Sequence, residues 1–146
     1  MNQVFTSASL ERTFAIAAEF SRQLLPGDFV ALEGDLGAGK TQFVRGMVRG
    51  MGGDPRDVSS PTYVLLNIYP TPRLQVFHLD AYRMTSEQDM EAIGFAELLE
   101  QGGVVVVEWW QKIATLVPAR RWTVKMEFVS PHKRRIEIQF PDPPAG

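Results

Sequence analysis

The segment GDLGAGKT at residues 34–41 constrains the fold of this chain more than any other feature, because it satisfies the pattern G-x-x-x-x-G-K-[ST] in full. The run FVALE at 29–33 precedes it and predicts a buried strand. The run 40–52 follows it and has apolar residues at helical spacing. A strand, a glycine-rich loop and a helix in this order bring backbone N–H groups and a helix N-terminus around phosphate oxygens. The segment therefore predicts a nucleotide phosphate-binding loop.

Each residue type in this loop has its own expected role. Glycine is required where a side chain would block the curvature of the loop or the approach of the phosphates. Lys40 is expected to reach the β- and γ-phosphates of a nucleotide, and the Thr41 hydroxyl is expected to ligate Mg²⁺. The alternative is an ordinary glycine-rich turn with a solvated lysine. The residues expected to bind the nucleotide are Gly34, Asp35, Leu36, Gly37, Ala38, Gly39, Lys40, Thr41 and Trp109.

Two predicted strands end in a carboxylate, which such a site needs near its metal. VFHLD ends at Asp80, and the four valines at 104–107 are followed by Glu108. Because α/β sheets place ligands at the carboxyl ends of their strands, both acids are candidates for catalysis and for binding Mg²⁺. Spacing alone does not decide which of the two meets the metal. The structural alternatives are a helix or turn cap for Asp80 and a satisfied polar residue at a strand end for Glu108.

Other residues near these motifs have two interpretations each. Trp109 can stack on a nucleotide base, or the pair Trp109-Trp110 can simply pack. SPTY at 60–63 lies where many nucleotide hydrolases keep a segment that senses the γ-phosphate, although a plain proline turn is the alternative. His78 and Asp80 alternate along a predicted strand and therefore share a face. The basic run 133–135 is expected to be a solvated turn rather than a phosphate site.

The rest of the chain predicts alternating helices and strands in one domain, 1–146. We expect a helix at 7–25 capped by Ser7 or Ser9, and a hairpin of 62–69 with 74–80. A helix capped by Thr85 or Ser86 should be interrupted by Gly94. Four consecutive valines predict a central strand that is covered on both faces. The remaining expectations are an edge hairpin of WTVKMEFV with RRIEIQF and a frayed tail at 141–146.

Composition excludes several classes of protein. The chain has 45% apolar residues, which argues against intrinsic disorder, and no cysteine, which excludes a disulfide scaffold and a zinc-thiolate site. Its 15 basic and 17 acidic residues leave a net charge of −2, so no overall basic field attracts nucleic acid. No apolar stretch is long enough to span a bilayer and no export signal is evident. We therefore expect a cytoplasmic protein.

Taken together, the blocks GDLGAGKT, SPTY at 60–63, HLDAYR at 78–83 and VEW at 107–109 resemble the TsaE (YjeE) family of small P-loop ATPases. The resemblance covers nearly the whole chain. It implies an α/β fold, a P-loop NTPase-like three-layer sandwich with a central, mostly parallel sheet and added antiparallel strands. It also implies ATP and Mg²⁺ as cofactors. Thr41, Asp80 and Glu108 match family positions at the metal and catalytic centre, and Trp109 matches one beside the nucleotide.

The resemblance further implies an accessory ATPase in threonylcarbamoyladenosine modification of tRNA. Such a protein joins TsaD and TsaB, meets tRNA only through that complex, and does not transfer the modifying group itself. We expect in-line attack of water on the γ-phosphorus, with Lys40 stabilising the charge. Glu108 would orient the water and Asp80 would hold the metal, or the reverse. No arginine is evidently placed as a finger, although Arg83 or an arginine of a partner could serve, so hydrolysis by the isolated protein should be slow.

Two other functions share the same phosphate-binding loop. The first is a P-loop kinase of a nucleoside or small metabolite, although the sequence has no arginine-rich lid segment and 146 residues leave little room for an acceptor pocket. The second is a nucleotide-gated interaction module with negligible turnover. A GTPase is less favoured because the guanine-reading sequence N-K-x-D is absent.

Overall fold

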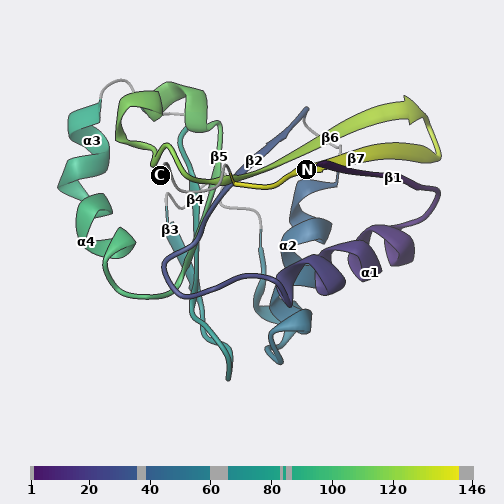
Figure 1. Ribbon diagram of the computed structural model, residues 1–146, viewed down its shortest axis with the longest axis horizontal. Coiled ribbons are helices and arrows are strands. Elements are labelled where there is room, and N and C mark those ends of the chain that lie inside the picture. Colours follow the sequence, from purple (N-terminus) through teal and green to yellow (C-terminus); the bar gives the residue numbers. More distant parts are fainter. Residues whose placement is uncertain (1, 36–38, 60–65, 83, 85–86, 142–146) are drawn as a thin grey trace, which may run out of the picture.

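The computed structural model describes residues 2–35, 39–59, 66–82, 84 and 87–141. Within them, seven strands form one sheet in the order β1-β7-β6-β2-β5-β4-β3 (Figure 1). The four strands β6, β2, β5 and β4 run parallel, and β1, β7 and β3 are added antiparallel. This confirms the predicted α/β class. The strands are β1 (Asn2–Ser7), β2 (Phe29–Gly34), β3 (Leu66–Tyr69), β4 (Val76–Asp80), β5 (Val104–Glu108), β6 (Trp122–Ser130) and β7 (Lys133–Gln139).

Helices cover both faces of the sheet and make three layers (Figure 1). Residues of α1 and α2 share one apolar core with one face of the sheet, and residues of α3, α4 and the 3₁₀ segment η2 share a second core with the other face. The helices are α1 (Leu10–Ser21), α2 (Lys40–Gly50), α3 (Glu87–Ala92) and α4 (Phe95–Leu99), with the 3₁₀ segments η1 (Pro55–Asp57) and η2 (Trp110–Leu116).

The valine run forms β5, whose side chains alternate between these two cores. Val104 and Val106 belong to the core beneath α1 and α2, whereas Val105 and Val107 belong to the core beneath α3 and α4. All four are buried, which confirms the expectation of a strand covered on both faces. β5 lies between β2 and β4, so the two strands that end in the candidate carboxylates, Asp80 and Glu108, are neighbours.

The N-terminal region differs from its prediction. Helix α1 begins at Leu10, after Ser9, whose side-chain oxygen accepts a hydrogen bond from the Arg12 N–H at 3.0 Å. It ends at Ser21, so the predicted range of 7–25 is too long. The preceding residues form β1, which pairs with β7. The hairpin of β6 and β7 is therefore antiparallel as predicted, but its predicted position at the edge is wrong because β1 occupies that edge.

Most other elements lie where the sequence predicts them. β3 and β4 pair as an antiparallel hairpin, and Gly94 separates α3 from α4 in a left-handed conformation, φ 78°. Residues 60–65, the predicted caps Thr85 and Ser86, and the tail at 142–146 lie outside the described residues. Within the described part of the chain, no helix is both long enough and apolar enough to cross a membrane.

Candidate active site

The glycine-rich segment connects the end of β2 to the start of α2, as the motif predicts. β2 ends at Gly34, and Lys40 is the first residue of α2. Gly39 caps the helix with φ 101°, a left-handed conformation that other residues rarely adopt, so glycine is required there. Leu36, Gly37 and Ala38, which we also expect to bind nucleotide, lie outside the described residues.

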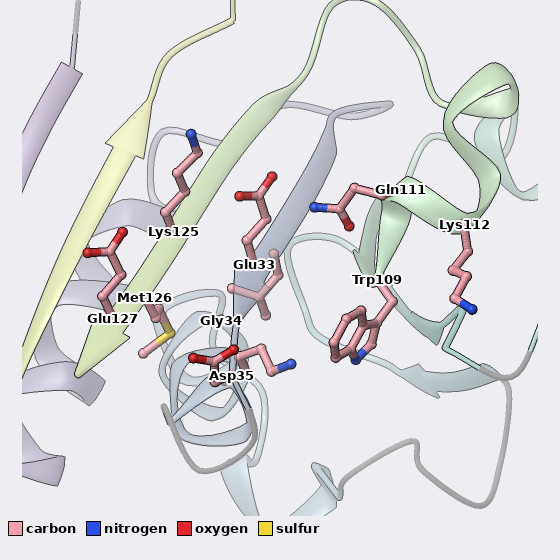
Figure 2. A pocket seen from close by; sticks show the side chains of 11 residues that line it. Glu33, Gly34, Asp35, Trp109, Gln111, Lys112, Lys125, Met126 and Glu127 are labelled. Atoms are coloured by element: carbon pink, nitrogen blue, oxygen red, sulfur yellow. The ribbon is translucent and has the colours of Figure 1, made fainter.

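A pocket of about 580 Å³ opens beside this junction. Figure 2 shows that the labelled lining side chains come from the carboxyl-terminal end of β2, from the middle of β6 beside it, and from the segment after β5. This is the edge at which α/β sheets bind ligands. Of the predicted site residues, the pocket contains Gly34, Asp35, Lys40 and Trp109. The other lining residues are Leu32, Glu33, Gln111, Lys112, Lys125, Met126 and Glu127.

Glu108 lies at the end of β5 and makes two contacts through different oxygens. Its Oε2 atom is 2.7 Å from Nε2 of His78, and its Oε1 atom is 3.3 Å from Nζ of Lys40. The residue is only 6% exposed. Burial alone would raise the pKa of this carboxyl, but the hydrogen bond from His78 and the charge of Lys40 outweigh burial, so its pKa lies below the usual value.

Sheet geometry explains why Glu108 meets Lys40. Alternate residues of a strand share a face, so Glu108 points to the same side as Val104 and Val106, which face α1 and α2. Lys40 begins α2 on that side. The structure therefore brings together the lysine of the loop and one of the two predicted carboxylates.

Asp80 lies at the end of β4, directly opposite Glu108 in the register of the two strands. Its Oδ1 atom accepts a hydrogen bond from the Tyr82 backbone N–H at 2.8 Å, which is the turn-capping contact considered as its structural alternative. Loss of hydration raises the pKa of the Asp80 carboxyl above its usual value, and the nearby charge of Glu108 adds to this rise. Asp80 is thus a turn cap and a neighbour of Glu108 at once.

His78 is a part of the site that the sequence identifies only as sharing a face with Asp80. It is fully buried, with Nε2 on Glu108 and Nδ1 3.2 Å from the Tyr69 hydroxyl. The hydroxyl donates its single hydrogen to the carbonyl of Ser59 at 2.9 Å and accepts from the Ser59 N–H at 3.3 Å. The signal available from the sequence was the alternation of His78 and Asp80, which fixes a face but names no partner.

The two tryptophans have different surroundings. Trp109 lines the pocket, is 38% exposed, and lies with its ring centroid 5.3 Å from Nζ of Lys40. It is the only non-glycine residue with positive φ, 59°, in the described part of the chain. Trp110 instead donates from Nε1 to Glu33 at 2.7 Å and stacks under Arg121. Packing therefore accounts for Trp110, whereas Trp109 faces the space where a ligand would lie.

The remaining candidates are placed as follows. Thr41 lies in the first turn of α2, next to Lys40. The SPTY segment and Arg83 lie outside the described residues. In the basic run, Arg134 stacks on Phe128 at 4.0 Å and Arg135 pairs with Glu137 at 3.0 Å.

The donor set suits Mg²⁺ bound together with phosphates. An ionised carboxylate and a hydroxyl are oxygen ligands of the kind that Mg²⁺ prefers, and Mg²⁺ usually takes one or two carboxylates plus phosphate oxygens. Among the residues the structure describes, no cluster of three or more acidic, histidine or cysteine side chains could bind a metal without such help. The oxygen donors at the site are therefore of the kind that could hold Mg²⁺ together with phosphate oxygens.

Comparison with known proteins gives concordant results. The family model described as "Threonylcarbamoyl adenosine biosynthesis protein TsaE" matches residues 7–136. A protein of Rickettsia prowazekii named tRNA threonylcarbamoyladenosine biosynthesis protein TsaE is 36% identical over 133 residues, 91% of this chain and 92% of that protein. The protein of the same name from Bacillus subtilis is 38% identical over 126 residues, 86% of this chain and 78% of that protein.

A solved structure has the same fold. The crystal structure of YdiB from Bacillus subtilis superposes with a TM-score of 0.79 and 28% sequence identity. The alignment covers 97% of this chain and 87% of that one. The likeness therefore extends over all the layers of the molecule, including the sheet edge that carries the candidate site.

Proposed function

This chain belongs to the TsaE family, which takes part in tRNA threonylcarbamoyladenosine biosynthesis, and we propose that it is the Mg²⁺-dependent, ATP-hydrolysing accessory protein of that modification. In this proposal it acts with a TsaB–TsaD transferase assembly and meets tRNA through that assembly. The observation that carries the proposal is the contact of 3.3 Å between Lys40 of the phosphate-binding loop and the buried carboxylate of Glu108. An ordinary glycine-rich turn would leave its lysine in solvent.

Lys40 and the N-terminus of α2 are proposed to bind the phosphates of ATP. The Lys40 side chain is only 10% exposed, and its ammonium group lies 3.3 Å from Oε1 of Glu108 and 5.3 Å from the centroid of the Trp109 ring. Phosphate oxygens entering the pocket would take over this ammonium group from Glu108. Lys40 would then stabilise the charge that spreads over the transferring phosphoryl group. Trp109, at the rim of the same pocket, is proposed to lie beside the nucleotide.

Thr41 and Glu108 are proposed to hold Mg²⁺. Because the pKa of Glu108 is lowered, its carboxylate is ionised at neutral pH, and Oε1 is the oxygen that faces Lys40 and the phosphate-binding loop. When bound, Mg²⁺ would neutralise charge on the phosphate oxygens and fix their orientation.

Asp80 is proposed to orient the attacking water and accept its proton. Its raised pKa makes it a stronger proton acceptor than an ordinary aspartate, and it lies directly opposite Glu108 at the same sheet edge. Of the two assignments that the sequence leaves open, the electrostatics favour Glu108 at the metal and Asp80 at the water.

The need for partner proteins is supported by the charges of the pocket. Its described cationic lining residues are Lys40, Lys112 and Lys125, and none of its described lining residues is an arginine. An arginine supplied by a partner is a common way to complete a site that transfers phosphoryl groups. We therefore expect slow hydrolysis by the isolated chain and faster hydrolysis in the complex.

The test is steady-state ATP hydrolysis with Mg²⁺, for the wild type and Glu108→Ala, alone and with TsaB, TsaD and tRNA. Hydrolysis should rise when the partners are added and should collapse in the variant. ATP that binds but is not hydrolysed in any mixture would contradict the proposal. It would indicate a nucleotide-gated assembly module, and a phosphorylated acceptor would indicate a kinase.

A further inference from the structure

We infer that His78 is a positioning residue, which holds one oxygen of the Glu108 carboxylate so that the other oxygen faces the phosphate-binding loop. The inference rests on the proposed function, because the value of that orientation lies in nucleotide-dependent chemistry. His78 is fully buried in β4 and its Nε2 atom lies 2.7 Å from Oε2 of Glu108. A histidine in this position acts through Glu108 and need not touch the substrate.

The proton between the two residues belongs to the histidine. The Nε2–Oε2 distance of 2.7 Å is that of a hydrogen bond, and a carboxylate that also pairs with Lys40 can only accept hydrogen bonds. Nε2 must therefore carry the hydrogen that lies between the two groups. A charge-assisted hydrogen bond of this length is among the stronger polar contacts in a protein interior.

The second nitrogen of the His78 imidazole ring also has a partner. Nδ1 lies 3.2 Å from the hydroxyl of Tyr69, and both backbone groups of Ser59 bond to that same hydroxyl, at 2.9 and 3.3 Å. Tyr69 is 3% exposed. β3 supplies the tyrosine, β4 the histidine and β5 the glutamate, which are three adjacent strands of the sheet. The ring consequently has fixed partners on both nitrogens.

In this arrangement the two oxygens of the Glu108 carboxylate have different partners. Oε2 is occupied by His78, whereas Oε1 contacts Lys40 at 3.3 Å. Without the histidine, the carboxylate would be free to turn both oxygens toward the ammonium group of Lys40. Partners that orient a ligating side chain in this way typically account for about 10- to 100-fold in metal affinity or activity.

Two substitutions separate orientation from mere filling of space. In His78→Gln the side-chain amide reaches the position of Nε2 and can still donate to Glu108. In His78→Asn the amide reaches only the position of Nδ1, so the contact with Tyr69 is kept and the contact with Glu108 is lost. We expect His78→Asn to raise the Mg²⁺ concentration needed for half-maximal ATP hydrolysis about 10- to 100-fold. His78→Gln should stay within a few-fold of the wild type.

A second measurement reads the contact without any turnover. The chain has two histidines, and His132 is exposed in the turn between β6 and β7, so it serves as an internal reference in ¹⁵N-resolved NMR of the imidazole nitrogens. We expect Nε2 of His78 to be protonated and slow to exchange, and its resonance to shift in Glu108→Gln while that of His132 stays unchanged. An unprotonated Nε2, or a His78 resonance that ignores Glu108→Gln, would overturn the inference.

The two measurements also keep this inference distinct from the proposed function. If the wild type never hydrolyses ATP, the proposed function fails, and the NMR result alone decides whether His78 holds Glu108. If the wild type is active but both His78 variants lose the same activity, or neither loses any, the positioning role is wrong and the proposed function stands. Thermal unfolding of both variants checks that each is folded.

Discussion

The ends of β4 and β5 occupy matched positions in the sheet but differ in chemistry. Asp80 and Glu108 are opposite each other in the parallel register, and each is the last residue of its strand. Glu108 is enclosed by donors from His78 and Lys40, which keep its pKa below the usual value. Asp80 is capped by a backbone N–H of the following turn, and loss of hydration leaves its pKa raised.

The difference shows that position on a sheet does not assign a role to a carboxylate. Both acids satisfy the rule that ligands meet α/β sheets at the carboxyl ends of the strands. In the proposed mechanism, the charged neighbours of Glu108 favour a fixed negative charge there, and the loss of hydration at Asp80 favours proton transfer. The predictions below test this division in order of expected effect.

Asp80→Asn should cause the largest loss. If Asp80 accepts the proton of the attacking water, its neutral isostere should lower the maximal rate of ATP hydrolysis about 10²- to 10⁴-fold, the range typical of a general base. The half-saturating concentrations of ATP and Mg²⁺ should change little. Phosphate release at saturating Mg·ATP measures this, and a variant that turns over at the rate of the wild type would exclude the role.

Glu108→Gln should act first on the metal. Loss of the ionised oxygen that faces the phosphate-binding loop should raise the Mg²⁺ concentration needed to support ATP binding by about 10- to 100-fold or more. ATP affinity titrated against Mg²⁺ measures this effect, and Asp80→Asn is the matched control because it removes the opposite carboxylate. Equal shifts in the two variants would show that the two strand ends share one role.

The same Glu108→Gln variant should also destabilise the nucleotide-free protein. It replaces the ionised acceptor of His78 by a neutral amide oxygen and removes the anionic partner of Lys40, at a cost of about 1–3 kcal/mol. Because the pKa of Glu108 is depressed in the folded state, its stabilisation is present above its ordinary value of 4.5 and is lost as pH falls through the folded value. Urea unfolding in EDTA should therefore show a gap between wild type and variant at pH 7 that narrows below pH 4.5.

Asp80→Asn should have a smaller effect on stability, of the opposite sign. The pKa of Asp80 is raised in the folded state. The stability linked to protonation of Asp80 is therefore present below pH 3.8, its ordinary pKa, and is lost as the pH rises through the pKa of the folded state. The neutral asparagine keeps the acceptor for the Tyr82 N–H without a partly dehydrated charge. We expect a slightly higher unfolding midpoint than wild type at pH 7 and none of this gain below pH 3.8. A lower midpoint at pH 7 would refute the sign.

Local patterns made much of the fold predictable. The strand 29–33, the helix from Lys40 and the valine run each have an unambiguous period or motif, and the structure has β2, α2 and β5 there. Nothing in the sequence predicts β1, because its six residues are mostly exposed and carry no alternating apolar pattern. The strand is formed by pairing with β7 at the other end of the chain. For the same reason, the sequence predicts the C-terminal hairpin at an edge, whereas β1 occupies that edge in the structure.

The residues of the candidate site can be named from the sequence, but their contacts cannot. Lys40, Asp80, Glu108 and Trp109 follow from motifs and strand ends. The hydrogen bond between His78 and Glu108 joins residues far apart in the chain, and only the order of the strands brings them together. The left-handed backbone of Trp109 likewise has no signal in the sequence, because tryptophan rarely adopts it.

The strand order also determines when each strand can find its partners during synthesis of the chain. β2, which leads into the phosphate-binding loop, has only β5 and β6 as sheet partners, and β1 pairs with β7. A nascent chain that has just exposed residues 2–59 therefore holds two strands without neighbours, since their partners begin at residues 104, 122 and 133. Such long-range pairing delays folding and leaves strand edges open. We expect a ribosome-bound fragment ending before β5 to be unable to retain nucleotide. The N-terminal segment, which is made first, would become able to bind nucleotide only after the C-terminal strands have been made.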